Sequence, residues 1–246
     1  MANGKNAAII ANYEEQARVS PFDMLLTGRY ISSLFGYANR LGRFLADEME
    51  LKAPDRVLDA GCSVGIYHKP MAARVRSLIG IDASPTSVAR ASRHNAGLKN
   101  ASYKVGNLLA LKPEEFPHRF DKILCYSVVH FLGDINEFET MLKGLIGLLE
   151  NGHGIIFLGE VRERELYEAF KNRKSTGFRD AKFAVLKVAS RWLLRNAKFQ
   201  TGLAPTLFSR SEIEALIGRL DGKCERIEEA SWHPFYNTCA DYRLRF

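Results

Sequence analysis

Residues 56–65, RVLDAGCSVG, constrain this chain more than any other segment. An apolar strand runs into Asp59 and then into a turn that begins and ends with glycine. An apolar segment at 66–75 follows and predicts a helix, and a second apolar strand at 78–81 ends in Asp82. A strand, a glycine turn, a helix, a strand and an acid in this order form one nucleotide-binding half of a doubly wound sheet. The segment therefore predicts a fold and also a ligand that contains ribose.

Strands and helices alternate through most of the remaining chain. We expect strands at 56–60, 77–82, 102–106, 120–127, 154–161, 223–231 and 239–246. We expect helices at 28–50, 65–76, 85–97, 135–150, 162–173, 180–199 and 210–220. Ser84 and Ser209 are expected helix N-caps, and Pro85 suits a first helical position. The pattern predicts a Rossmann-like, doubly wound α/β sheet of seven strands, with helices on both faces and the last strand antiparallel.

Three parts follow from this pattern. Residues 1–54 form a helical lid, residues 55–161 and 206–246 form the Rossmann-like core, and residues 162–205 form a helical insertion after the fifth strand. The formal net charge is +7, and the segment 162–198 accounts for all of it, with eleven Lys and Arg against four Asp and Glu. So localised a charge indicates an anionic partner.

The basic segment leaves several interpretations open. It is a packed lid helix with an ordinary solvated face, or it binds a phosphate or carboxylate of the substrate, an anionic membrane surface, or an RNA backbone. Substrate capping fits the geometry best, because the insertion leaves the fifth strand at the active edge of the sheet. Aromatic residues are too sparse among the basic ones to favour a nucleic acid.

Targeting and metal-binding signals are weak. No run of 18 apolar residues exists, and the first eight residues do not form a secretory signal. The four cysteines are scattered and show no zinc-ligand spacing with histidine. We therefore expect a cytoplasmic protein with reduced thiols and no metal site.

The glycine turn discriminates between ribose-containing ligands. The dinucleotide fingerprint G-x-G-x-x-G is absent, because Ser63 stands between the glycines and the spacing is G-x-x-x-G. No G-x-x-x-x-G-K-[ST] phosphate loop occurs. Asp59, just before the turn, would repel a pyrophosphate but suits a cationic group such as an amino-acid ammonium.

These motifs resemble those of the class I S-adenosylmethionine-dependent methyltransferases. Residues 57–65 resemble the first motif of that family, and residues 79–84 resemble its acid motif after the second strand. Gly106-Asn107-Leu108 lies where the family often has Gly-Asp-x, and residues 120–130 resemble its fourth-strand motif. The resemblance covers about residues 55–160. Ser63 replaces the usual middle glycine, and Asn107 replaces the common Asp.

The resemblance implies S-adenosylmethionine as cofactor and assigns residues to it. Asp59 and the turn residues Gly61, Cys62, Ser63 and Gly65 would hold the methionine part. Asp82 would bind the ribose, with Ala83, Asn107 and Leu108 around the adenine. Cys125 would line the methionine side through its carbonyl, and Arg29 and Tyr13 are further candidates from the lid.

Acceptor-side candidates must lie at the carboxyl edge of the sheet. His130 follows the fourth strand and Glu160 ends the fifth, and these two are the candidate catalytic residues. Packing of His130 or ion pairing of Glu160 would explain their presence equally well. Tyr126, His233 and Tyr236 are candidates for contact with the substrate. The Asn/Asp-Pro-Pro-Tyr motif of base amino-group methylation is absent, so no DNA partner is expected and RNA is disfavoured.

The sequence thus predicts a methyltransferase that acts on an oxygen or nitrogen of a small or lipid-linked, anionic acceptor. A sugar or nucleotide-sugar, a polysaccharide precursor or a natural product would fit the basic insertion. Two alternatives remain at this point. One is a non-catalytic, cofactor-binding partner subunit, and the other is an RNA methyltransferase that uses the insertion.

Overall fold

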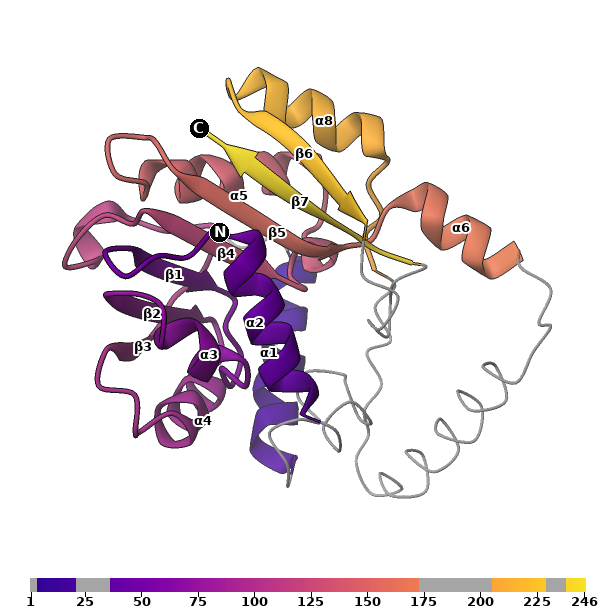
Figure 1. Cartoon of the computed structure of the whole chain (residues 1–246). Coiled ribbons are helices and arrows are strands. Elements are labelled where there is room, and N and C mark those ends of the chain that lie inside the picture. Colours follow the sequence, from indigo (N-terminus) through magenta and orange to yellow (C-terminus); the bar gives the residue numbers. More distant parts are fainter. Residues whose placement is uncertain (1–3, 21–35, 173–204, 229–237) are drawn as a thin grey trace.

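The computed structural model describes residues 4–20, 36–172, 205–228 and 238–246 (Figure 1). The centre is a seven-stranded sheet in the order β3-β2-β1-β4-β5-β7-β6. Its strands are β1 (Arg56–Ala60), β2 (Ser77–Asp82), β3 (Ala101–Val105), β4 (Lys122–Tyr126), β5 (Ile155–Val161), β6 (Lys223–Glu228) and β7 (Ala240–Arg245). The first five pair in parallel, while β7 runs antiparallel to both β5 and β6. The predicted sheet, with its reversed last strand, is confirmed.

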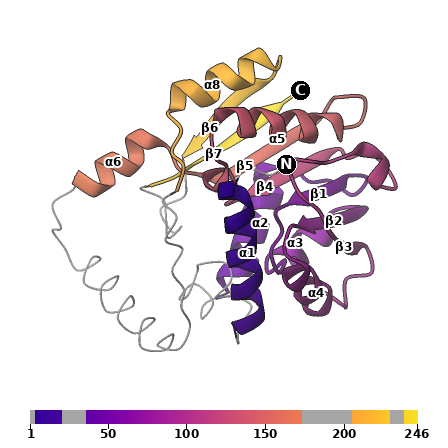
Figure 2. The same ribbon diagram turned by 180° about the vertical axis from the view of Figure 1, so that it is seen from behind.

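Helices cover both faces of the sheet (Figures 1 and 2). They are α1 (Gly4–Val19), α2 (Tyr37–Glu48), α3 (His68–Ala72), α4 (Pro85–His94), α5 (Ile135–Gly147), α6 (Arg164–Asn172) and α8 (Arg210–Arg219). None of the described helices is both long enough and apolar enough to cross a bilayer.

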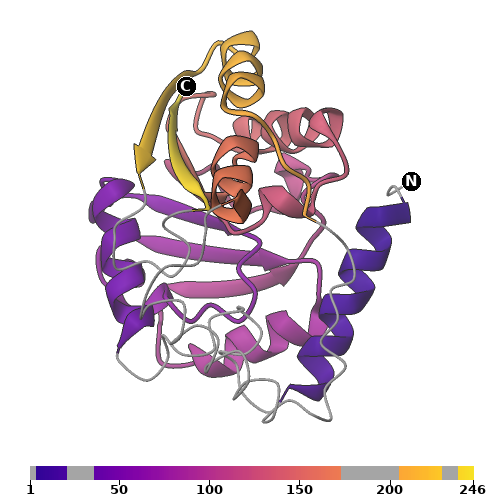
Figure 3. The same ribbon diagram turned by 90° about the vertical axis from the view of Figure 1, so that its right-hand side faces the viewer.

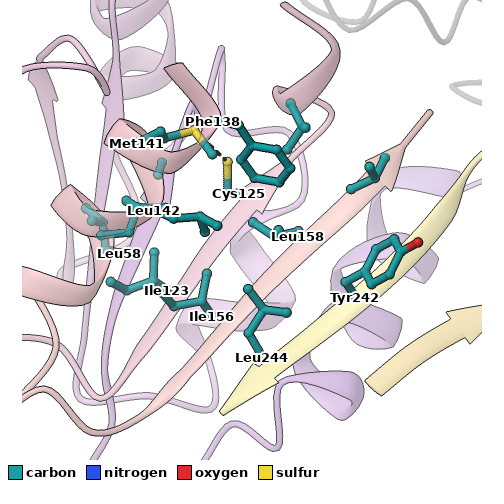
Figure 4. Close-up of a cluster of buried hydrophobic side chains, with 14 of the residues drawn as sticks. Leu58, Ile123, Cys125, Phe138, Met141, Leu142, Ile156, Leu158, Tyr242 and Leu244 are labelled. Carbon is teal, nitrogen blue, oxygen red and sulfur yellow. Dashed lines mark hydrogen bonds between the residues drawn. The ribbon is translucent and has the colours of Figure 1, made fainter. Parts of the chain in front are cut away.

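Alternation along the buried strands produces two hydrophobic cores. On β1, Val57 faces the core under α2 and α3, while Leu58 faces the core under α5 and α8. Figure 4 shows the second core, where Phe138 and Leu142 of α5 meet strand residues such as Ile156. Continuous burial of β4 and β5 is expected for central strands with helices on both sides.

The predicted helix starts are confirmed. The Ser84 side chain accepts a hydrogen bond from the Ser87 N–H at the start of α4, and Pro85 occupies its first turn. Ser209 forms a reciprocal capping box with Glu212 at the start of α8. These local signals fix where each helix begins relative to the sheet.

The predicted helix at 65–76 was too long. The observed helix α3 covers only His68–Ala72. Gly65 has a φ of 61°, which a right-handed helix does not allow, so the glycine turn extends further than the apolar pattern suggested. The predicted helix at 28–50 is described only as α2, and residues 28–35 lie outside the described part. The predicted helix at 180–199 also lies outside it.

Candidate cofactor and substrate pocket

A pocket of ≈ 250 Å³ lies at the carboxyl ends of β1, β2, β4 and β5. The chain order reverses between β1 and β4 at this edge, which is where open α/β sheets bind ligands. Its walls come from α1, the turns after the four strands, and the residues after β3. The lining residues are Ile9, Ile10, Tyr13, Gly61, Cys62, Ser63, Tyr67, Asp82, Ala83, Ser84, Ser87, Asn107, Leu108, Leu109, Tyr126, Ser127, Val128, His130, Phe131, Leu132 and Arg162.

The glycine turn after β1 forms the pocket floor. Gly61 has a φ of 91°, and a Cβ built there would lie 2.4 Å from Cγ2 of Val128. Ser63 also has a positive φ, 47°. The Gly61 and Cys62 N–H groups donate to the carbonyl of Ile81, at 2.8 and 2.9 Å, so the turn is tied to β2. The absence of a side chain at position 61 keeps the backbone open to a ligand.

The Asp82 carboxylate accepts hydrogen bonds from two turns. Its Oδ2 accepts from the Ser63 N–H at 2.8 Å, and its Oδ1 accepts from the Ser84 N–H at 2.9 Å. Burial raises the pKa of this carboxyl, although the two backbone donors oppose the shift. Each carboxylate oxygen has two lone pairs, so each retains an acceptor site toward the pocket. Asp82 can therefore accept a pair of ligand hydroxyls without releasing the turns.

Asp59 lies behind the turn, fully buried. Its Oδ2 is 2.6 Å from Nε2 of His68, whose Nδ1 is 2.8 Å from the Tyr103 hydroxyl. Its Oδ1 is buried without a hydrogen-bond partner. The side chain does not reach the pocket lining, so in this structure Asp59 supports the turn through His68 rather than from the ligand side.

Helix α1 lines one side of the pocket with Ile9, Ile10 and Tyr13. The helix packs against α4 (Figure 3). Glu14 accepts hydrogen bonds from the Ser84 hydroxyl at 2.6 Å, from the Thr86 N–H at 3.1 Å and from the Thr86 hydroxyl. At its other end, Arg90 of α4 donates to the carbonyls of Ala17 and Ser20. These contacts hold Ile9, Ile10 and Tyr13 over the pocket.

The far end of the pocket is aromatic. The Tyr126 ring lies over Gly159 of the neighbouring strand, where a Cβ would come within 2.0 Å of the ring. His130 and Phe131 form one tilted ring pair, and Phe131 makes an edge contact with Tyr13 at a centroid distance of 5.0 Å. Ser127 has a φ of 62°, which marks a sharp bend where β4 ends.

Most predicted site residues meet at this pocket. Those that line it are Tyr13, Gly61, Cys62, Ser63, Asp82, Ala83, Asn107, Leu108, Tyr126 and His130. Asp59, Gly65, Cys125 and Glu160 do not line it, and the predicted roles of both groups of residues remain predictions. The Cys125 side chain is buried in the core against Met141 at 4.0 Å, and Glu160 is 2% exposed. Arg29, His233 and Tyr236 lie outside the described residues.

Sequence reasoning missed part of the lining. Arg162 was counted only as one charge of the basic segment, yet it lines the pocket directly after β5. Ile9, Ile10 and Phe131 gave no signal, because apolar residues near a loop or on a helix look like ordinary core. The position of Arg162 at the carboxyl end of a central strand was the signal that could have identified it.

The comparisons with known proteins agree with this geometry. Residues 57–152 match the family model described as a methyltransferase domain. In solved structures, the fold is similar to that of the DhpI-SAM-HEP complex, with a TM-score of 0.63, 12% identity and coverage of 100% of this chain and 99% of that one. It is also similar to the N-methyltransferase NodS from Bradyrhizobium japonicum WM9 in complex with S-adenosyl-l-homocysteine, with a TM-score of 0.59, 18% identity and coverage of 95% and 97%.

Curated relatives match over shorter stretches. Nodulation protein S of Rhizobium tropici is 28% identical over 106 residues, 43% of each chain. The ubiquinone biosynthesis O-methyltransferase of Pseudomonas fluorescens (strain Pf0-1) is 34% identical over 113 residues, 45% of this chain and 47% of that protein. The 23S rRNA (uracil(1939)-C(5))-methyltransferase RlmD of Stenotrophomonas maltophilia (strain K279a) is 35% identical over 92 residues, 35% of this chain and 20% of that protein. The matches thus span less than half the length of these relatives.

Residues 57–152 thus match a methyltransferase domain, and the seven-stranded sheet around them has the fold of the class I methyltransferase family. The cofactor of the family is S-adenosylmethionine.

Proposed function

We propose that this protein transfers a methyl group from S-adenosylmethionine to an oxygen or nitrogen of a small, anionic acceptor. The observation that carries the proposal is the pocket at the switch between β1 and β4, with the glycine turn, Asp82 and Asn107 on one side and an aromatic end on the other. The names of the relatives, which include an N-methyltransferase and an O-methyltransferase, support this choice of acceptor atoms.

The pocket residues fit the cofactor. Asp82 keeps one acceptor site on each oxygen for the two ribose hydroxyls. Leu108 and Ala83 offer apolar surface to an adenine, and the Asn107 side chain lies beside them. The bare backbone at Gly61 leaves room for the methionine part, which the buried carboxylate of Asp59 would favour electrostatically from behind the turn.

The bound cofactor would supply an activated methyl group on a sulfonium, so the protein mainly has to align the acceptor and exclude water. Helix α1 and the aromatic residues Tyr13 and Phe131 cover the pocket and would exclude water. His130 lines the pocket, and it is the candidate to remove a proton from an acceptor that must lose one. The lid role of residues 1–54 and the capping role of 162–205 belong to the same proposal.

Calorimetry with S-adenosylmethionine tests the cofactor assignment. We expect Asp82→Ala to weaken binding about 10- to 100-fold, because hydrogen bonds to a charged group contribute about 1.5–3 kcal/mol. Asp47→Ala removes an exposed carboxylate of α2 that pairs with Arg74 on the surface, and this variant should bind the cofactor normally. Unchanged tight binding of S-adenosylmethionine by Asp82→Ala would contradict the assignment of Asp82 to the ribose.

The acceptor class is tested with a labelled methyl group in cell extracts. We expect the label to enter the small-molecule or lipid fraction. Label in RNA, with binding that weakens steeply as salt rises, would favour an RNA methyltransferase instead. Normal cofactor binding without any labelled product would favour a non-catalytic partner subunit.

A further inference from the structure

Among the described residues, one cation of the pocket wall has no counter-charge. Arg162 follows β5 and lines the pocket, and its Nε is buried without a hydrogen-bond partner. Within the described residues, its guanidinium forms no ion pair and no hydrogen bond. Arg162 is partly buried, and a polar group removed from water without a partner costs free energy, as its Nε does here. An anion that binds at this point of the pocket would offset that cost.

The acid next to Arg162 in the chain, Glu163, binds other partners. The Glu163 carboxylate accepts hydrogen bonds from Nε and Nη2 of Arg226, at 2.7 and 3.0 Å, and from the Tyr242 hydroxyl. Arg164, the next arginine along, pairs with Glu212 at 3.2 Å. The sequence around Arg162 thus contains enough carboxylates to neutralise it, but the fold directs Glu163 to the other side of the chain.

The position of Arg162 separates it from the ribose end of the pocket. Asp82 follows β2 and Arg162 follows β5, with β1 and β4 between them. Three strand spacings of about 4.8 Å put the two strand ends about 14 Å apart. The residues assigned to the adenosine lie near Asp82, so Arg162 stands at the opposite end, on the acceptor side.

The pocket residues on the β4 and β5 side indicate the chemistry of the rest of the ligand. Tyr126, Phe131 and Leu132 line the pocket after β4, the strand next to β5, and these side chains are aromatic or apolar. A guanidinium fork binds carboxylate and phosphate groups in bidentate fashion. We propose that Arg162 binds an oxyanion, a carboxylate or a phosphate, carried by an acceptor with a compact apolar or aromatic body. This inference rests on the proposed methyltransferase function and names the acceptor class and the residue that selects it.

The test uses the full chain saturated with S-adenosylhomocysteine and three probes: benzoate, phenyl phosphate and neutral benzamide. By calorimetry, we expect at least one oxyanion probe to bind the wild type more tightly than benzamide, and the preferred probe reveals whether the site takes a carboxylate or a phosphate. Arg162→Ala should weaken that probe about 10- to 100-fold. Arg162→Lys should restore part of the affinity, because a lysine keeps the charge but not the fork.

Two controls separate this proposal from its alternatives. Arg93→Ala removes an exposed arginine of α4 that does not line the pocket, and it should leave probe binding unchanged. The affinity for S-adenosylhomocysteine should be the same in Arg162→Ala as in the wild type. A loss of that affinity would mean that Arg162 holds the cofactor carboxylate, and would overturn the proposal.

Equal binding of the oxyanion probes by wild type and Arg162→Ala, or no binding of either oxyanion by the wild type, would also overturn it. These results leave cofactor binding intact, and hence the proposed function. If the wild type fails to bind S-adenosylhomocysteine at all, the proposed function itself fails, and this inference fails with it.

Discussion

At the scale of single residues, the pocket floor depends on one missing side chain. Gly61 has a φ of 91°, and a Cβ there would lie 2.4 Å from Cγ2 of Val128, which itself lines the pocket. Two penalties therefore act on any other residue: a left-handed backbone conformation and a steric clash with the turn after β4. A substitution here would therefore displace the glycine turn after β1, the pocket floor that we expect to hold the methionine part of the cofactor.

Gly61→Ala should accordingly lower stability by about 1–3 kcal/mol, the usual cost of a strained backbone conformation. It should also weaken cofactor binding at least tenfold, because the turn must move. Urea unfolding and calorimetry measure the two effects.

Gly97→Ala is the matched control, since a Cβ there meets nothing within 4 Å. The double variant Gly61→Ala/Val128→Ala should recover part of the loss, because the two side chains are in direct contact. If Gly61→Ala bound the cofactor normally, the turn would not be the floor of the cofactor site.

The sequence predicted this residue and several of its neighbours in the pocket, but not the apolar ones. Glycines and acids next to strands carry their own signal, because few residue types tolerate those conformations or accept ligand hydroxyls. Phe131 and Ile9 gave none, since an apolar residue has the same appearance in a core and in a pocket wall. The orientation of Asp59, away from the pocket and toward His68, depends on tertiary packing that no spacing rule contains.

At the scale of elements, the pocket is closed by the attachment of α1 to α4. The Glu14 carboxylate lies at the N-terminus of α4, where the helix dipole and three donors favour a negative charge. Burial alone would raise the pKa of Glu14, but the hydrogen bonds from Ser84 and Thr86 outweigh it and lower the pKa. The contact is therefore made by the ionised form.

Glu14→Ala should loosen α1 and weaken cofactor binding several-fold, because Ile9 and Tyr13 then lose their fixed place over the pocket. Hydrogen exchange in residues 4–20 should become faster, while exchange in the sheet should not change.

Glu15→Ala removes the adjacent carboxylate, which is exposed and 3.9 Å from Arg18, and should change neither quantity. Slow exchange of α1 in Glu14→Ala would show that the apolar contacts and the Arg90 hydrogen bonds suffice to attach the helix.

The same contact predicts a pH dependence. Because the folded-state pKa of Glu14 is depressed, its contribution is fully present above the unfolded-state pKa of 4.5 and is lost as pH falls through the lower folded-state value. The protection of α1 amides, measured relative to the intrinsic exchange rate at each pH, should therefore fall below about pH 4.5 in the wild type. In Glu14→Ala this particular step should be absent, and a step of the same size in the variant would assign it to another group.

Element boundaries show where sequence patterns stop being informative. Ser84 and Ser209 predicted two helix starts, because capping is a local interaction between residues three apart. The helix after the glycine turn was predicted too long, since its apolar residues are buried for reasons other than helical periodicity. Ile66 and Val75 pack into the core under α2 although they lie outside α3.

At the scale of the whole molecule, a buried ionic cluster joins the reversed end of the sheet to the start of the insertion. Glu163 lies between β5 and α6, while its partners Arg226 and Tyr242 come from β6 and β7. The side chains of Glu163 and Arg226 are only 3% and 16% exposed. Glu163 is 63 positions from Arg226 and 79 from Tyr242 in the chain, so the strand order 5-7-6 is what brings them together. Because Glu163 binds Arg226 and Tyr242, it does not pair with Arg162, its neighbour in the chain.

Glu163→Gln should therefore cost about 3–5 kcal/mol of stability, because it removes the buried carboxylate that pairs with the largely buried Arg226 guanidinium. Urea unfolding measures this, and Glu139→Gln, which breaks exposed pairs with Lys143 and Arg219, is the control that should change stability little. The double variant Glu163→Gln/Arg226→Met should recover much of the loss, since it removes the charge that Glu163 compensated and retains an apolar stem. Equal destabilisation by the single and the double variant would mean that the cluster acts through shape and hydrogen bonding to Tyr242 rather than through charge.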